Sequence, residues 1–69
     1  MALLEKLINT AKAIELLEQN LADRLRVLGP DHSDTLSSRN NLAYAYESAG
    51  RLEEAIALYE EVLAVRMRI

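Results

Sequence analysis

The sequence predicts an all-α fold made of three helices. Apolar residues recur at spacings of three, four and seven over long stretches, which is the helical period. Gly29 and Gly50 separate these stretches, and no segment alternates apolar and polar residues as a strand would. The chain has 69 residues and therefore forms one small domain at most. We expect helices over about residues 2–28, 33–49 and 52–68.

The first predicted helix occupies residues 2–28. Its apolar stripe consists of Leu3, Leu7, Ile14, Leu17, Leu21 and Leu28. Gly29 can adopt a positive φ just past the helix end, and Pro30 has no N–H with which to continue it. We expect one continuous helix of about 25 residues, roughly 40 Å long at 1.5 Å per residue. A break near Asn9–Thr10, with a short helix before it, is the alternative.

The second predicted helix begins near Ser33 or Asp34. Asp31, Ser33 and Asp34 can each accept a hydrogen bond from the free N–H groups of a first turn, and the sequence does not choose among them. Gly50 ends this helix as Gly29 ends the first. The expected apolar stripe is Leu36, Leu42, Ala43, Tyr46 and Ala49.

The third predicted helix follows a connection of only two residues, Gly50 and Arg51, which requires an antiparallel neighbour. Its ends match the helix dipole, because acidic residues lie in the first turn (Glu53, Glu54) and basic residues in the last turn (Arg66, Arg68). The expected apolar face consists of Leu52, Ala55, Ile56, Tyr59, Val62, Leu63 and Met67.

Composition excludes several classes of partner and cofactor. Eight basic and eleven acidic residues are spread along the chain without a basic stripe, so we expect no nucleic acid partner. The apolar start Met1–Leu4 is too short for a signal peptide or a membrane span, and we expect a cytoplasmic protein that does not bind membranes. A weaker alternative is that residues 1–12 lie on a membrane surface as an amphipathic helix. No cofactor is expected.

An internal repeat relates Ala13–Val27 to Ala55–Ile69 at an offset of 42 residues. A fixed period of this length, with a pair of helices in each unit, is typical of an α-solenoid. The identical pairs are Ala13/Ala55, Ile14/Ile56, Leu16/Leu58, Glu18/Glu60, Leu21/Leu63, Ala22/Ala64, Arg24/Arg66 and Arg26/Arg68.

The repeat resembles a known family. The residues that carry the resemblance are Asn41-Leu42-Ala43, Tyr46, Gly50, Glu54-Ala55, Tyr59 and Leu63. They resemble the signature of the tetratricopeptide repeat. The period of 42, the run Val27–His32 and the later run Arg39–Ala43 are similar, more narrowly, to the repeats of kinesin light chains and their bacterial relatives.

The resemblance implies a fragment of an α-solenoid built from antiparallel helical hairpins. Residues 13–28 would be the second helix of a partial repeat, and residues 33–69 would be one complete repeat. Residues 1–12 do not repeat residues 43–54 and would form a helical extension outside the repeat. Ser33 also stands where the subfamily usually has proline. The abrupt start of the pattern is typical of a truncated or designed repeat protein.

The segment Asp31–Asp34 contains an acid, an imidazole, a hydroxyl and a second acid. Catalytic groups must converge in space, whereas adjacent residues in a turn point apart. His32 is the only histidine, and no cysteine could complete a zinc site. We therefore expect no enzyme, no catalytic residue and no metal site. A small enzyme or metal protein centred on His32 is the remote alternative.

Two surfaces are candidates for protein binding. In the resembled family the middle helix lines a groove for an extended peptide, which implies a peptide site at Ser37, Asn40, Asn41, Tyr44 and Ser48. Fewer than three repeats seldom bury a continuous core, so uncovered apolar faces also predict self-association, with helices exchanged about a hinge at Gly29 and Pro30 as one possible form. The candidates are Leu3, Leu4, Leu7, Ile8, Val62, Leu63, Met67 and Ile69. A module that binds its own copies is the first hypothesis, and a peptide-binding repeat from a larger scaffold is the second.

Overall fold

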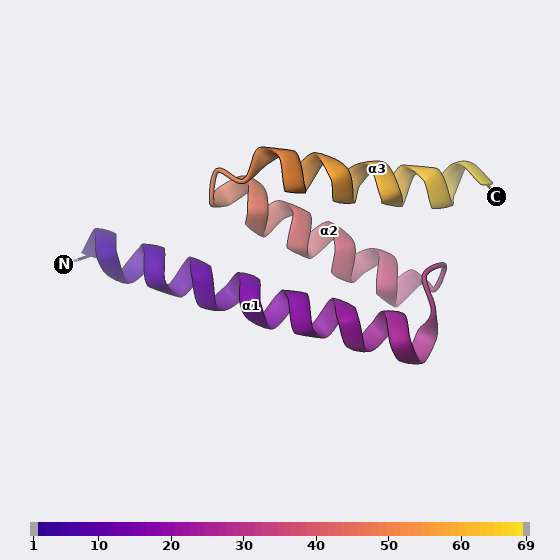
Figure 1. Cartoon of the computed structure of the whole chain (residues 1–69), viewed down its shortest axis with the longest axis horizontal. Coiled ribbons are helices and arrows are strands. Elements are labelled where there is room, and N and C mark those ends of the chain that lie inside the picture. The colour runs from indigo at the N-terminus through magenta and orange to yellow at the C-terminus, as the bar shows by residue number, and fades with distance from the viewer. Residues whose placement is uncertain (1, 69) are drawn as a thin grey trace.

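The computed structural model describes residues 2–68, which form three helices: α1 (Ala2–Leu28), α2 (Ser33–Ser48) and α3 (Leu52–Arg68). The helices run antiparallel, with α2 packed between α1 and α3 (Figure 1). Principal-axis extents of 47 × 23 × 13 Å make the molecule elongated. The predicted all-α fold is confirmed, and α1 is continuous through Asn9 and Thr10. Within residues 2–68, every helix is too short or too polar to cross a membrane.

Two glycines end the first two helices as the sequence predicts. Gly29 has a φ of +88° and Gly50 a φ of +80°, the left-handed region that glycine adopts without strain. α2 ends at Ser48, one residue before the expected limit of about residue 49, and Ala49 is its C-cap. The Arg51 N–H donates to the Tyr46 carbonyl over 2.8 Å, and so satisfies one of the carbonyl groups in the last turn of α2.

The start of α2 has a cap that the sequence analysis did not choose. His32 is the N-cap, in an extended conformation, and its Nδ1 accepts a hydrogen bond of 3.0 Å from the Asp34 N–H. A neutral imidazole nitrogen can accept in this way. The N-cap is therefore none of the three predicted residues, Asp31, Ser33 and Asp34.

The core lies where α1 and α3 pack against α2. It contains Ile14 and Leu21 of α1, Leu42 and Tyr46 of α2, and Ala55 of α3. Partly buried apolar side chains surround this cluster, namely Leu17, Leu25, Ala45, Leu58 and Tyr59. With so few large buried residues, the core supplies only modest stability.

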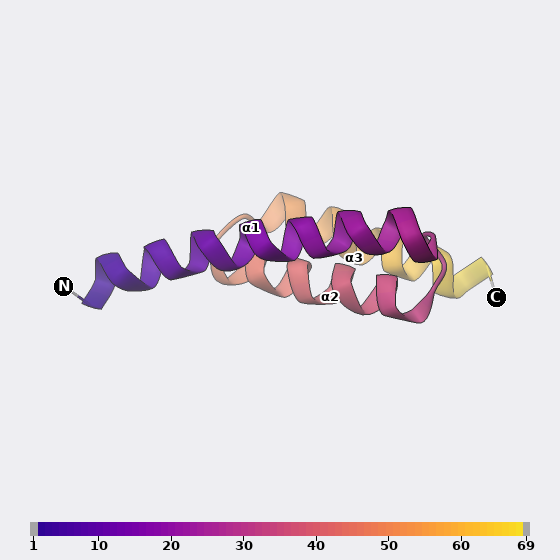
Figure 2. The same cartoon turned by 90° about the horizontal axis from the view of Figure 1, so that it is seen from below.

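The predicted apolar stripes are only partly buried. Leu3 and Leu7 are exposed, because α1 extends past the end of α2 and nothing in residues 2–68 covers its first turns (Figure 2). The self-association candidate Val62 is a correction: it is 3% exposed and lies on the side of α3 that packs against α2. Val65, absent from the predicted face, is buried beside it. The candidate Ile69 lies outside the described residues.

Polar side chains also join α1 to α2. Ser38 is 1% exposed, and its hydroxyl donates to Asn20 Oδ1 over 2.8 Å. The Tyr46 hydroxyl donates to Glu18 Oε2 over 2.6 Å. These bonds satisfy groups that would otherwise be buried without partners, and they set the register of the two helices.

Candidate functional site

The loop Asp31–Asp34, whose residue types are those of a catalytic cluster, makes contacts that stabilise the fold. His32 caps α2, and the Asp31 carboxylate accepts a hydrogen bond of 3.1 Å from Arg68 at the end of α3. The backbone carbonyl of Asp34 accepts from Arg24 over 2.8 Å. These groups therefore face different helices and do not converge on one point. Within residues 2–68, no three potential metal ligands gather at a single position.

The five peptide-site candidates lie along the side of α2 that points away from the core. Asn40 is half-buried, and the other four are exposed: Ser37, Asn41, Tyr44 and Ser48. Tyr44 and Ser48 also line a wide depression between α2 and the first turns of α1, opposite Lys6, Asn9 and Thr10. This face, here called the polar face, thus has amide and hydroxyl groups beside a shallow groove.

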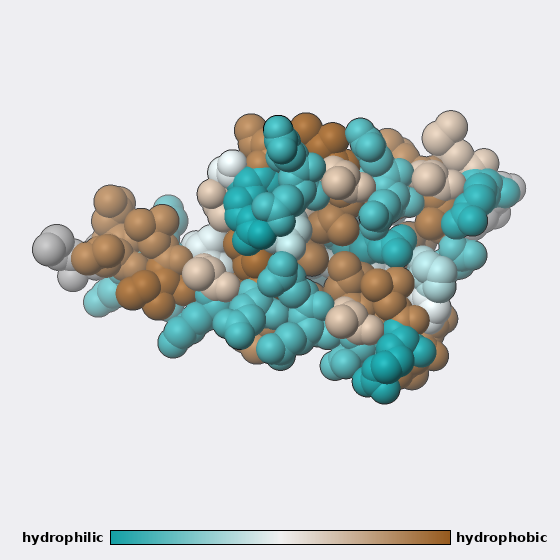
Figure 3. All heavy atoms as spheres, in the orientation of Figure 1, coloured by the Kyte–Doolittle hydropathy of each residue, from teal (hydrophilic) through white to brown (hydrophobic). Residues whose placement is uncertain are grey.

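The first turns of α1 form a second candidate surface, here called the arm (Leu3–Lys12). Figure 3 shows apolar atoms gathered over this end of the molecule. The large apolar side chains of the arm are all more than half exposed: Leu3 76%, Leu4 56%, Leu7 62% and Ile8 53%. An apolar concentration of this kind on a projecting helix is typical of a protein-binding segment.

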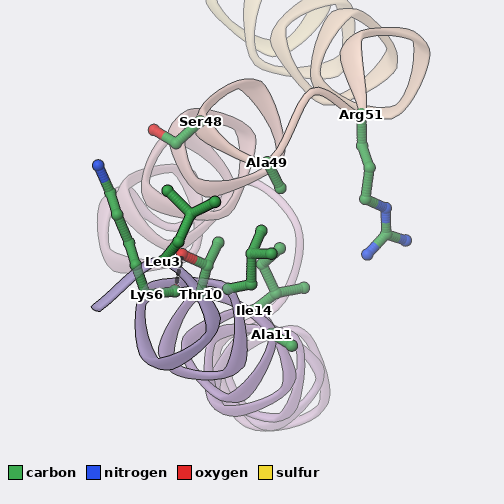
Figure 4. Close-up of a pocket in the computed structure, with 9 residues that line it drawn as sticks. Leu3, Lys6, Thr10, Ala11, Ile14, Ser48, Ala49 and Arg51 are labelled. Atoms are coloured by element: carbon green, nitrogen blue, oxygen red, sulfur yellow. Dashed lines mark hydrogen bonds between the residues drawn. The ribbon is translucent and has the colours of Figure 1, made fainter. Parts of the chain in front are cut away.

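A pocket of about 410 Å³ lies between the arm and the turn that joins α2 to α3. Leu3 and Ile14 of α1 face Ala49 and Arg51 across it (Figure 4). Most of the α1 residues that line the pocket are apolar. They stay uncovered because α2 stops at Ser48, before it can reach them. It is therefore the open end of the α1–α2 interface.

Arg51 belongs to a charged cluster at the edge of this pocket. Its guanidinium lies 4.4 Å from the centroid of the Tyr46 ring, and its Nε donates to Glu54 over 2.7 Å. The bond to Arg51 lowers the pKa of Glu54. Burial, together with the hydrogen bond to Glu18 and its negative charge, raises the pKa of Tyr46 to about 12. Tyr46 therefore stays neutral and keeps donating to Glu18 at physiological pH.

The side of α3 that faces away from α2 is the third candidate surface, here called the outer face. Its large side chains are exposed: Leu52 57%, Ile56 54%, Leu63 55% and Met67 82%. Ile56 and Leu63 are the repeat counterparts of Ile14 and Leu21, which are buried against α2. The outer face therefore carries the same apolar residues that α1 uses to bind a helix.

The repeat and the helical hairpin together define the family. The tetratricopeptide repeat model matches residues 2–68. The chain belongs to the tetratricopeptide repeat family. The predicted likeness to kinesin light chains is also confirmed, because the chain is 42% identical over 55 residues to Protein KINESIN LIGHT CHAIN-RELATED 3 of Arabidopsis thaliana, and 38% identical over 55 residues to Protein KINESIN LIGHT CHAIN-RELATED 2.

These alignments cover most of the chain but little of the relatives. They span 80% of this tetratricopeptide repeat chain and 8% of each relative. No solved structure matches the chain significantly. Tetratricopeptide repeats are solenoid units that present surfaces to other proteins, so the chain is a protein–protein interaction module.

The sequence analysis did not predict that three polar residues of this repeat are buried. Thr35, Ser38 and Arg39 are buried between helices although their side chains are polar. Arg39 Nε, for example, forms an ion pair with Glu61 over 3.5 Å. Apolar periodicity could not find these residues, and only the resemblance included one of them, Arg39.

Proposed function

We propose that this interaction module associates with copies of itself through its exposed apolar faces, and that it acts as a cytoplasmic, non-enzymatic scaffold. The observation that carries the proposal is the outer face of α3. Ile56 and Leu63 are exposed there, whereas their counterparts Ile14 and Leu21 pack against a helix. A surface with the composition of a helix interface, but with no helix on it, favours association.

Exposed apolar surface at both sides of the stack supports the same proposal. Repeat proteins bury a continuous core by stacking units against one another, and within residues 2–68 large apolar side chains are exposed on both α1 and α3. We assign residues 13–28 to the second helix of a partial repeat, residues 33–69 to a complete repeat, and residues 1–12 to an extension. In this division both ends of the stack carry apolar surface.

Exchange of helices about Gly29 and Pro30 is a less favourable form of association. Exchange would open the chain between α1 and α2 and replace the α1–α2 contact within one copy by the same α1–α2 contact between two copies. Such an exchange buries no additional apolar surface, so it has no hydrophobic driving force to offset the entropy lost on association. Docking of intact molecules through their exposed faces does bury additional surface.

Sedimentation equilibrium of the chain, from micromolar to millimolar concentration, tests the proposal. We expect an average mass that rises with concentration, together with unchanged far-ultraviolet circular dichroism. A constant monomer mass over the whole range would contradict self-association.

A second function, binding of an extended peptide, rests on the polar face. Asn41 and Tyr44 offer amide and hydroxyl groups beside the depression that also contains Ser48. An amide both donates and accepts, as a peptide backbone requires. Titration of extended peptides, followed by the NMR signal of the Asn41 side-chain amide, tests this function. Saturable shifts would support it, and unchanged shifts would contradict it.

A further inference from the structure

We infer that the copies join head to tail, with the arm of one copy docked on the outer face of α3 of the next. This inference rests on the proposed self-association and specifies its geometry. The two surfaces belong to helices on opposite sides of α2, and the first turns of α1 project past the turn between α2 and α3 (Figures 1 and 2). Because the arm is part of the straight helix α1, it reaches only the outer face of another copy.

The outer face is built to receive a helix. On α1, the counterparts of Ile56 and Leu63 are buried by α2, with exposed fractions of 4% and 8%. The polar partners are repeated as well: Glu60 and Arg66 correspond to Glu18 and Arg24, which hydrogen-bond Tyr46 and the Asp34 carbonyl of α2. The outer face therefore reproduces an observed helix-docking surface.

The arm has the form of the helix that such a surface receives. It is helical, and its apolar side chains at Leu4, Leu7, Ile8 and Ala11 follow the spacing i, i+3, i+4, i+7. This is the pattern of anchors by which an amphipathic helix docks in an apolar groove. Docking would cover the apolar surfaces of both partners at once.

Charge favours pairing of the arm with the outer face over pairing of like surfaces. The arm carries Lys6 and Lys12 against one acidic residue, Glu5, and is therefore net positive. On the outer face, Glu53 and Glu60 lie one turn from Ile56 and Arg66 lies one turn from Leu63, so this face is net negative. Two arms would bring lysines together, and two outer faces would bring these glutamates together. The arm on the outer face joins opposite charges.

A head-to-tail contact has a consequence for assembly size. Each added copy leaves one free arm and one free outer face, so growth continues unless a ring closes. We therefore expect the average mass of the chain to pass beyond that of a dimer as concentration rises. A mass that stops at the dimer would overturn the head-to-tail geometry while leaving self-association intact.

Complementation between two variants gives the decisive test. Leu7→Glu blocks the arm and Leu63→Glu blocks the outer face, and both positions are exposed, at 62% and 55%, so both variants should fold. We expect each variant alone to be monomeric. An equimolar mixture should form a one-to-one dimer, because one variant retains an intact outer face and the other an intact arm. Leu16→Glu, at a position of α1 that is 66% exposed and lies outside all three candidate surfaces, is the matched control and should assemble like the unmodified chain.

Other results would overturn the inference in distinguishable ways. If one variant still self-associates, the contact uses two like surfaces and only the head-to-tail geometry fails. If both variants are monomeric and their mixture is too, the arm and the outer face do not bind each other. If the unmodified chain is monomeric, the proposed self-association fails together with the inference.

A charge exchange tests the contact independently. In the Leu63→Glu background, which keeps the arm, Lys6→Glu with Lys12→Glu should weaken binding to the Leu7→Glu variant about three- to tenfold, as expected for two exposed ion pairs. Glu53→Lys with Glu60→Lys in the Leu7→Glu partner should restore it. Failure of this restoration would contradict the proposed orientation.

Discussion

Two segments of the molecule, residues 13–26 of α1 and residues 55–68 of α3, are identical at eight of fourteen positions but have different environments. Ile14 is 4% exposed and its counterpart Ile56 is 54% exposed. Leu21 and Leu63 differ in the same way, at 8% and 55%. Each helix packs one side against α2, but α1 uses the side that α3 leaves open. Burial at these positions is therefore determined by the neighbouring helix.

Two of the positions at which the two segments differ follow the same division. Val62 and Val65 are buried against α2, and their counterparts on α1 are the exposed polar residues Asn20 and Asp23. Asn20 accepts a hydrogen bond from Ser38 instead of filling a core. At these two positions the residue type is thus matched to the environment, apolar where α2 buries the side chain and polar where the side chain is exposed.

Exchanging these differing residues should have the largest effect. Val62→Asn places an amide in an apolar site that is 3% exposed, and we expect a loss of about 3 kcal/mol or more. Since a core of this size contributes roughly 3–5 kcal/mol, most of the chain should unfold. Circular dichroism during thermal denaturation measures this.

The reciprocal change, Asn20→Val, is the control for that exchange. It removes only the hydrogen bond of Ser38, with an expected loss of about 1–2 kcal/mol. Equal losses for the two substitutions would contradict the division of burial between the helices.

Truncation of an identical pair should have the next largest effect. Leu21→Ala opens a cavity in the core and should destabilise the chain by about 2–4 kcal/mol. Leu63→Ala changes an exposed residue and should alter the free energy of unfolding by less than about 0.5 kcal/mol. Urea denaturation at low concentration, where the chain is monomeric, compares the two. Similar losses of unfolding free energy for the two substitutions would contradict the difference in burial between Leu21 and Leu63.

High pH should weaken the contact that α1 makes with α2 through Tyr46. The pKa of Tyr46 is raised to about 12 from its usual value of 10, so the folded state favours the neutral hydroxyl. This contribution to stability is complete below pH 10 and is lost as pH rises through 12. We expect the thermal midpoint to fall across this interval, and to fall less in Tyr46→Phe. Tyr44→Phe, at an exposed position, should behave like the unmodified chain.

The two equivalent arginines should show the smallest difference. Arg24 donates to the Asp34 carbonyl over 2.8 Å, whereas its counterpart Arg66 lies on the exposed side of α3. Arg24→Met should lower the free energy of unfolding by about 0.5–1 kcal/mol, and Arg66→Met should leave it nearly unchanged. A larger effect of Arg66→Met in the monomer would indicate an intramolecular role for the outer face.

The helices and their ends were predictable from local sequence. Both signals are local along the chain. Gly29 and Gly50 end the helices that precede them, and the leucines that define each helix are spaced three to four residues apart. The cap of α2 was not predictable, because several polar residues compete there and the side chain of one competitor, Asp31, bonds Arg68 at the distant end of α3. The buried Ser38 and Arg39 were missed for a related reason, since their partners lie on other helices.

The candidate surfaces were predicted in part. The apolar residues of the arm are exposed, as are Leu63 and Met67, but Val62 is not available to a partner. Periodicity placed seven apolar residues of α3 on one broad face, whereas packing against α2 divides them into a buried side and an outer face. The side that a neighbour covers could not be read from α3 alone.

The sequence by itself determined the number of helices, their approximate limits, the repeat of 42 residues and the family, because these depend on local spacing and on the positive φ that glycine adopts without strain. Only the tertiary structure decided which of two nearly identical stripes is buried. The physical reason is that apolar burial needs a second surface: α2 covers one side of each neighbouring helix, and it stops at Ser48 before it reaches the arm.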